Sequence, residues 1–164
     1  MLRQILNKFG TTIYLQIWGN RLKLTDTRTG LIFDEKPLVA IKSDSKGHLS
    51  ILAVGNSATD AIGDNIEITN PFSHPRVLLS DFKVGERLLQ YAFKEILSNT
   101  ILPPSPRLVV HPMEKTEGGL TMIEVRAFRE LALGAGARDA IIYQGRELSA
   151  QEIDFESLKE QTDE

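Results

Sequence analysis

The spacing of the hydrophobic residues changes along the chain, and this change constrains the fold more than any other feature. Between residues 11 and 54 the apolar residues follow the short, alternating pattern of β-strands, in segments separated by residues 19–20 and 29–30. From residue 81 to about residue 97 they recur every three to four positions, as in a helix with a wide apolar face. A strand-rich first part followed by alternating helices and strands predicts a mixed α/β fold whose sheet is partly parallel.

The first part of the chain is expected to be a meander. Residues 11–18, 21–26 and 36–42 alternate apolar and polar side chains and predict its three strands. Residues 48–54 predict one further short strand.

A less regular segment separates the meander from the first long helix. Residues 55–75 are rich in glycine, asparagine, aspartate and proline, which predicts loops with one short helix or a strand at residues 66–69. Farther along, residues 107–111 and 139–143 are compact apolar runs that predict two buried strands. Helices alternate with these strands, so we expect the strands to be parallel.

The helix ends carry recognisable capping residues. Asp81 stands where the long helix needs an N-cap, and Thr121 with Glu124 three residues later forms the pattern of a capping box. Gly134 is expected to end this second helix as the residue after its C-cap. A weak acidic helix or tail that frays is expected over residues 149–164.

Composition excludes several classes of function. The chain of 164 residues carries a formal charge of −3, which argues against nucleic acid as the main partner. It contains no cysteine, so disulfides, thiolate catalysis and cysteine metal sites are excluded. The three histidines, His48, His74 and His111, lie far apart, and no metal site is expected. No secretory signal or membrane span is recognisable, and we expect a cytoplasmic protein.

The first nine residues place apolar side chains at spacings of one, three and four, with two cations among the polar positions, which predicts a short amphipathic helix. Such a helix suits shallow insertion at an anionic bilayer surface, or packing on the core of the domain. A helix this short is marginal in water, so one attachment would be weak and reversible. The residues expected to contact a membrane are Met1, Leu2, Arg3, Ile5, Leu6, Lys8 and Phe9.

Several longer motifs resemble one family. LPPSPRLVV followed by VRAFRELALGAGARDAIIY resembles the first half of MreB, the bacterial actin-like rod-shape proteins. GLIFDEKPLVAIK is similar to the third-strand region of that family, VLLSDFKVGERLLQYAFKEI to its first long helix, and MLRQILNKF to its membrane-binding helix. The resemblance runs, with gaps, over residues 1–145.

The resemblance implies an actin-like, ribonuclease H-like fold. The chain then divides into a helix over residues 1–10, the first actin-like subdomain over 11–148 with a reduced small subdomain at about 48–75, and the acidic helix or tail over 149–164. The family binds its nucleotide between two halves, and the second phosphate loop and adenosine-binding segment belong to the half that is not matched here.

The motif that the family uses for phosphate is altered. Where the family has Asp-Leu-Gly-Thr, this chain has Gln16, Ile17, Trp18 and Gly19. The resemblance implies that Gln16 replaces a carboxylate that serves magnesium, and that the Trp18 indole obstructs the approach of phosphate; we expect this indole to be buried or to face a cleft.

Two further positions bear on catalysis. About five residues are added relative to the family in residues 113–120, and Gln144-Gly145-Arg146 stands where the family has Glu-Glu-Pro. Glu124 falls where the family keeps the glutamate that orients the attacking water, but its place in a capping box explains it without catalysis. Phosphate-loop glycines should follow a strand, whereas those at 134–136 follow a helix and are better explained as its end.

These observations predict a non-catalytic MreB-like protein without a cofactor, acting in cell morphogenesis as an adaptor or regulator of the actin-like cytoskeleton at the inner face of the membrane. Its expected partner is a protein, either full-length MreB or an envelope-morphogenesis protein, with weak membrane-surface binding and no nucleic acid. Two alternatives remain open: a small-molecule or nucleotide-binding protein remodelled from the same scaffold, and a truncated remnant.

Overall fold

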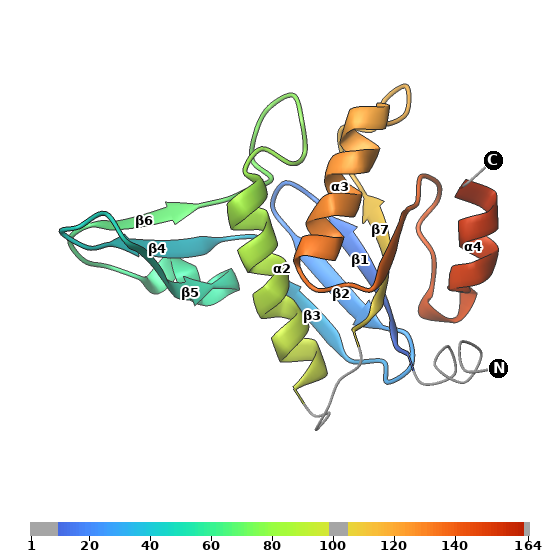
Figure 1. The fold of residues 1–164 in the computed structure, drawn as a ribbon, viewed down its shortest axis with the longest axis horizontal. Helices are drawn as coiled ribbons and strands as arrows, with labels where there is room; N and C mark the ends of the chain where they lie inside the picture. Colours follow the sequence, from blue (N-terminus) through green and yellow to red (C-terminus); the bar gives the residue numbers. More distant parts are fainter. Residues whose placement is uncertain (1–9, 99–104, 163–164) are drawn as a thin grey trace.

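A five-stranded sheet with helices on both faces and a separate three-stranded sheet make up the computed structural model, which describes residues 10–98 and 105–162 (Figure 1). The larger sheet has the order β3-β2-β1-β7-β8. β1 pairs antiparallel with β2 and parallel with β7, β2 pairs antiparallel with β3, and β7 pairs parallel with β8. The mixed, partly parallel sheet is therefore confirmed. Its strands are β1 (Thr12–Ile17), β2 (Leu22–Asp26), β3 (Ile32–Glu35), β7 (Arg107–Pro112) and β8 (Asp139–Ile142).

The prediction for the third strand of the meander was wrong. β3 is formed by residues 32–35, and residues 36–42 instead lead into β4 (Val39–Ser43) of the other sheet. Residues 36–42 are the more apolar of the two segments, which explains the choice made from sequence. Only one residue of β3, Phe33, is buried in the core, and the side chains on either side of it are exposed. Pro37 lacks an N–H group and separates the two strands.

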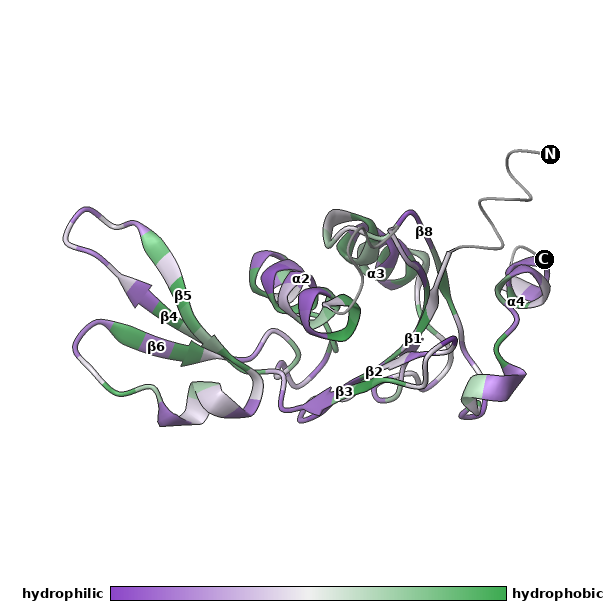
Figure 2. Cartoon of the chain, turned by 90° about the horizontal axis from the view of Figure 1, so that it is seen from below, coloured by the Kyte–Doolittle hydropathy of each residue, from purple (hydrophilic) through white to green (hydrophobic). Residues whose placement is uncertain are grey.

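The smaller sheet projects from the side of the molecule (Figures 1 and 2). Its order is β5-β4-β6, formed with β5 (Leu49–Val54) and β6 (Ile66–Thr69). A 3₁₀-helix, η1 (Gly55–Asp60), follows β5, so the irregular segment holds both a short helix and a strand. β4 belongs to this sheet, so the sheet includes residues that precede residue 48.

The two long helices begin where their caps were expected. α2 (Phe82–Leu97) starts after Asp81, whose side chain accepts a hydrogen bond from Val84 N at 3.0 Å. α3 (Met122–Gly134) starts after Thr121 in a capping box with Glu124. The end of α3 differs from the prediction: Gly134 is still helical and Ala135 is the C-cap. The chain turns at Gly136, whose φ of +115° is open to glycine and strained for other residues.

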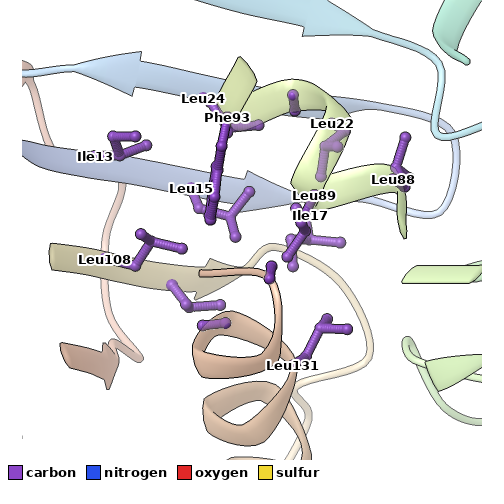
Figure 3. Packing of buried hydrophobic residues seen from close by; sticks show 14 of the residues in the cluster. Ile13, Leu15, Ile17, Leu22, Leu24, Leu88, Leu89, Phe93, Leu108 and Leu131 are labelled. Carbon is purple, nitrogen blue, oxygen red and sulfur yellow. The ribbon is translucent and has the colours of Figure 1, made fainter. Parts of the chain in front are cut away.

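α2 and α3 lie on one face of the five-stranded sheet, and the main core forms between these helices and the sheet (Figures 2 and 3). Alternation along β1 directs every second side chain to this face. Core residues that are fully buried include Ile13, Leu15, Ile17, Leu22, Leu24, Leu88, Leu89, Leu108 and Leu131.

The C-terminal segment, predicted as a weak acidic helix or a tail that frays, contains a helix that packs on the opposite face. A short 3₁₀-helix, η2 (Ala150–Glu152), precedes α4 (Phe155–Thr162). Phe155 and Leu158 are buried against side chains of β1, β7 and β8. Two ion pairs flank this contact, Arg107–Glu156 at 2.9 Å and Lys159–Asp139 at 2.7 Å. Phe155 and Leu158 were not identified as core residues from the sequence, because two apolar residues give no clear pattern in a mostly acidic segment.

Candidate functional site

The turn between β1 and β2 lies at the end of the sheet where its parallel strands also finish. Trp18 N donates a hydrogen bond to Arg21 O at 2.9 Å, so Gly19 and Asn20 form the tip of the turn. Because β1, β7 and β8 are parallel, the segments that follow β7 and β8 reach the same edge. Residues 16–19, 113–120 and 144–146, which the sequence singled out separately, thus come together.

The backbone N–H of Gly19 is hydrogen-bonded to a carboxylate of the protein itself. Glu114 Oε2 accepts a hydrogen bond from Gly19 N at 2.9 Å, and Asn70 Nδ2 donates to Gly19 O at 2.7 Å. A Cβ at position 19 would lie 3.0 Å from Glu114 Oε2, so the close approach uses the absence of a side chain. Glu114 comes from the added segment, and its carboxylate sits where an external anion would meet this amide.

The side chain of Gln16 is buried and engaged. It is 1% exposed, and its Nε2 donates to Glu147 Oε1 at 2.8 Å and lies 3.9 Å from Met113 Sδ. The neighbouring Ile17 belongs to the main core. The amide of Gln16 therefore serves contacts within the protein.

Trp18 is half-buried beside Arg21, whose guanidinium carbon lies 5.0 Å from the centre of the indole ring. This distance is within the range of a cation–π contact. The indole therefore has a fixed neighbour on the turn.

The added segment is a compact loop tied to its surroundings. Lys115 has a φ of +56°, and its ammonium group donates to the backbone oxygen of His74. Gly119 N donates to Thr116 O at 2.9 Å, and Leu120 N donates to Gln144 Oε1 at 2.8 Å. These bonds hold Glu114 over the turn.

A buried tyrosine–histidine pair lies below this loop. Tyr14 Oη and His111 Nδ1 are 2.7 Å apart, and His111 Nε2 lies 3.1 Å from Gly145 O. Because Gly145 O can only accept, Nε2 carries the proton, and in the neutral ring Nδ1 then accepts from the Tyr14 hydroxyl. That hydroxyl accepts in turn from Leu148 N at 3.2 Å. Burial lowers the pKa of His111, against the opposing effects of its bond to Gly145 and the charge of Glu147.

The lowered pKa of His111 predicts a loss of stability on mild acidification. Well above the unfolded-state pKa of about 6.5 the imidazole is neutral in both states, so it adds no pH dependence there. Below that pH the unfolded chain binds a proton and the folded protein resists it, so the free energy of unfolding falls by up to about 1.4 kcal/mol per pH unit. Urea titrations between pH 7 and pH 5 should show this slope, and His111→Gln should remove most of it. An unchanged slope in the variant would contradict the assignment.

A cavity of about 300 Å³ opens beside His111. It is lined by residues that follow β7 and β8, mainly Met113, Thr116, Gln144 and Gly145.

The side chain of Glu124 is engaged in the cap of α3: its Oε2 accepts from Thr121 N and Thr121 Oγ1, both at 2.8 Å. The capping box is therefore present in the fold, and it accounts for the orientation of this glutamate.

The histidines are not brought together. His48 Nδ1 lies 3.0 Å from Asp44, His74 caps its own turn, and His111 pairs with Tyr14. Within residues 10–98 and 105–162, no group of three or more histidine, aspartate or glutamate side chains is placed to hold a metal ion. The helices among these residues are too short or too polar to cross a membrane. The membrane-contacting residues proposed from sequence, 1–9, lie outside the described residues.

Sequence reasoning missed the residues that close the turn. It identified residues 113–120 as an addition but assigned no role to Glu114, and it passed over Glu147 and Tyr14. The addition itself was the available signal, because a loop inserted beside a phosphate-binding turn has the position to cover it.

Comparisons with known proteins agree with the geometry. The family model described as MreB/Mbl protein matches residues 21–154. Two cell shape-determining proteins MreB, from Haemophilus influenzae and from Escherichia coli K12, are each 32% identical to this chain over 88% of its length. The matches cover 40% and 41% of those proteins, so the chain spans about two fifths of the length of these relatives.

Solved structures share the fold at lower identity. MreB5 of Spiroplasma citri bound to AMPPNP gives a TM-score of 0.62 at 21% identity, over 82% of this chain and 38% of that one. A non-polymerising mutant of MamK bound to AMPPNP gives 0.59 at 14% identity, over 81% of this chain and 40% of that one. These likenesses establish the actin-like fold.

Proposed function

The chain belongs to the MreB/Mbl protein family, and we propose that it is a non-catalytic member that acts as an adaptor or regulator of the actin-like cytoskeleton of cell shape. The proposal includes a place in the cytoplasm, at the inner face of the membrane. The protein has the scaffold of the family, but the backbone N–H of Gly19 in the β1–β2 turn is hydrogen-bonded to Glu114.

The contact between Glu114 and Gly19 carries the proposal. A phosphate that approached this turn would meet a carboxylate already bound to the amide at 2.9 Å. Two like charges at such a distance repel each other, and more strongly where water is partly excluded. Phosphate would have to displace Glu114 together with the loop that holds it. The residues at this turn therefore do not fit a nucleotide phosphate.

The state of Gln16 supports the same proposal. Magnesium prefers carboxylates and water as ligands, whereas the buried amide of Gln16 donates its N–H to Glu147. Glu124, in its capping box, is already occupied by Thr121. No catalytic step is assigned to any of these residues.

An exposed apolar pair supports a protein partner. Met122 and Ile123 open α3 and are 89% and 82% exposed. Val77, 36% exposed, lines a small hollow together with Ile123 and Phe128. Large apolar side chains gathered at one place on a surface are typical of interaction sites. We assign this pair to the contact with an MreB filament.

Co-sedimentation with filaments tests this function. The chain is mixed with full-length MreB of the same cell, assembled with ATP, and the pellet is assayed at increasing filament concentration. Saturable pelleting is expected. The chain remaining in the supernatant beside pelleted MreB would exclude direct filament binding and favour an envelope-morphogenesis protein as partner.

Membrane attachment is proposed for the first nine residues, whose composition of five apolar and two cationic side chains suits an anionic bilayer. Leu6→Asp should abolish sedimentation with anionic liposomes and leave the melting temperature nearly unchanged. Asn7→Asp is the matched control, since it adds the same charge without removing an apolar contact. A large fall in melting temperature for Leu6→Asp would instead place residue 6 in the core.

The cavity beside His111 favours one second candidate, a protein remodelled to bind a small molecule. Its volume of about 300 Å³ is at the lower end for ligand pockets. A thermal-shift series with ATP, GTP and other metabolites distinguishes the two functions. A saturable rise in melting temperature would favour the remodelled pocket, and no rise at millimolar ligand would count against it.

A further inference from the structure

β3 forms a free edge of the five-stranded sheet. It is the last strand in the order, and within the described residues no strand pairs with its outer side. Asp26 N donates to Leu31 O at 2.9 Å. Along an antiparallel pair, the backbone N–H and C=O groups of successive residues point alternately toward the partner strand and away from it. Phe33 therefore directs its backbone groups to β2, while Ile32 and Asp34 direct theirs outward. Two consecutive ladder positions are open to an added strand.

A groove of about 400 Å³ runs along this edge, between β3 and the last turns of α2. Its apolar lining includes Ile32, which is 57% exposed, and Leu31, which is 43% exposed. Ile96 of α2 and Phe33 complete that lining. An extended segment placed beside β3 would therefore gain backbone hydrogen bonds and an apolar floor together.

The charge at the groove has one sign. Its charged lining residues are Asp34, Glu35 and Glu95. Asp34 is neutralised by Arg21, whose Nε lies 2.7 Å from Asp34 Oδ1. Glu35 and Glu95 remain; burial first, and then the charges of Glu95 and Glu35, raise the pKa of Tyr91. Tyr91 packs edge-on against Phe33, with ring centres 6.5 Å apart.

β3 is a short edge strand, but it lacks other devices that usually block an edge. Proteins protect edges with very short strands, proline, lysine, bulges or covering segments. β3 has neither proline nor lysine within Ile32–Glu35, and its register with β2 is regular. Its one outward charge, Asp34, is already paired.

We propose that β3 is a docking edge for an extended peptide segment of a partner protein, one that alternates apolar and cationic side chains. The segment pairs its backbone with Ile32 and Asp34. Its apolar side chains cover Ile32, on the face of β3 turned away from α2. Its cations lie on the α2 face, where their hydrocarbon stems cover Ile96 and their charges lie near Glu35 and Glu95. This surface is distinct from the Met122–Ile123 pair, so the proposal does not depend on filament binding.

Titration of the isotope-labelled full chain with a synthetic hexapeptide of alternating valine and lysine tests the proposal by NMR. The amide signals of Ile32 and Asp34 should shift saturably, and their hydrogen exchange should slow by about tenfold or more at saturation. A peptide of the same length with glutamate in place of lysine should bind at least about tenfold more weakly. Glu35→Gln with Glu95→Gln should reduce that preference, whereas Glu130→Gln, an exposed change on α3, should not.

Equal binding of the acidic and basic peptides would overturn the proposal. An absence of shifts at Ile32 and Asp34 at millimolar peptide would also overturn it. Backbone pairing is tested separately with a basic peptide that is N-methylated on the residues facing β3. This peptide should not bind, because it cannot donate to the edge, and binding equal to that of the parent peptide would exclude strand addition. The protein is unchanged in this comparison, so a folding defect cannot account for the result.

Discussion

Replacing Met122 and Ile123 together by aspartate is expected to weaken binding to full-length MreB filaments by at least about tenfold. The two side chains are 89% and 82% exposed, so the folded protein loses little by the change. At an interface the same change removes apolar area and introduces two charges that must lose water. Co-sedimentation over a range of filament concentrations measures the affinity, and the melting temperature reports the fold.

An isoleucine elsewhere on the surface provides the matched control. Ile62 is 93% exposed and follows η1, at the smaller sheet. Ile62→Asp should leave filament binding unchanged. If the Met122–Ile123 double variant binds as tightly as the parent protein, this pair is not the filament contact.

Phe155→Ala is expected to lower the free energy of unfolding by about 3 kcal/mol. The ring is 3% exposed and packs with Leu158 against Tyr14, Val109 and Ile141 on the second face of the sheet. Its truncation leaves a cavity there. It also removes the contact with the Arg107 guanidinium, whose carbon lies 4.9 Å from the ring centre.

Urea unfolding monitored by circular dichroism measures this loss. Glu160→Ala, at an exposed position of the same helix, should change the free energy by less than about 0.5 kcal/mol. A similarly small effect of Phe155→Ala would show that α4 contributes little to the fold and would restore the expectation of a fraying tail.

The elements that are determined by residues close to one another in the chain were predicted correctly from the sequence. Asp81 and the Thr121–Glu124 capping box are recognisable within four residues, and the helices begin there. The strands β7 and β8 are short apolar runs next to helices, which is how parallel strands appear in a sequence. β3 was missed because a short edge strand with one buried residue has almost no periodic signal. α4 was misjudged because its stability comes from contacts with β1, β7 and β8 rather than from its own sequence.

The candidate site was predictable in part, and only through the resemblance. The altered residues 16–19 could be identified by comparison with the family motif, but the partners that engage them could not. Glu114 lies 95 positions from Gly19, and Glu147 lies 131 positions from Gln16. Nothing near either glutamate in the sequence indicates which amide it will meet. Such pairs depend on the order of the strands, and the fold had to be known before they could be found.

The central claim is that Glu114 closes the β1–β2 turn to phosphate, and the backbone amide of Gly19 reports on it most directly. In an NMR titration of the labelled protein with magnesium and ATP, the Gly19 signal should not move at millimolar nucleotide. In Glu114→Ala the same signal should shift even without ligand, because the amide loses the carboxylate it binds. A saturable shift of Gly19 in the unaltered protein, at micromolar nucleotide, would contradict the account and show a working phosphate site.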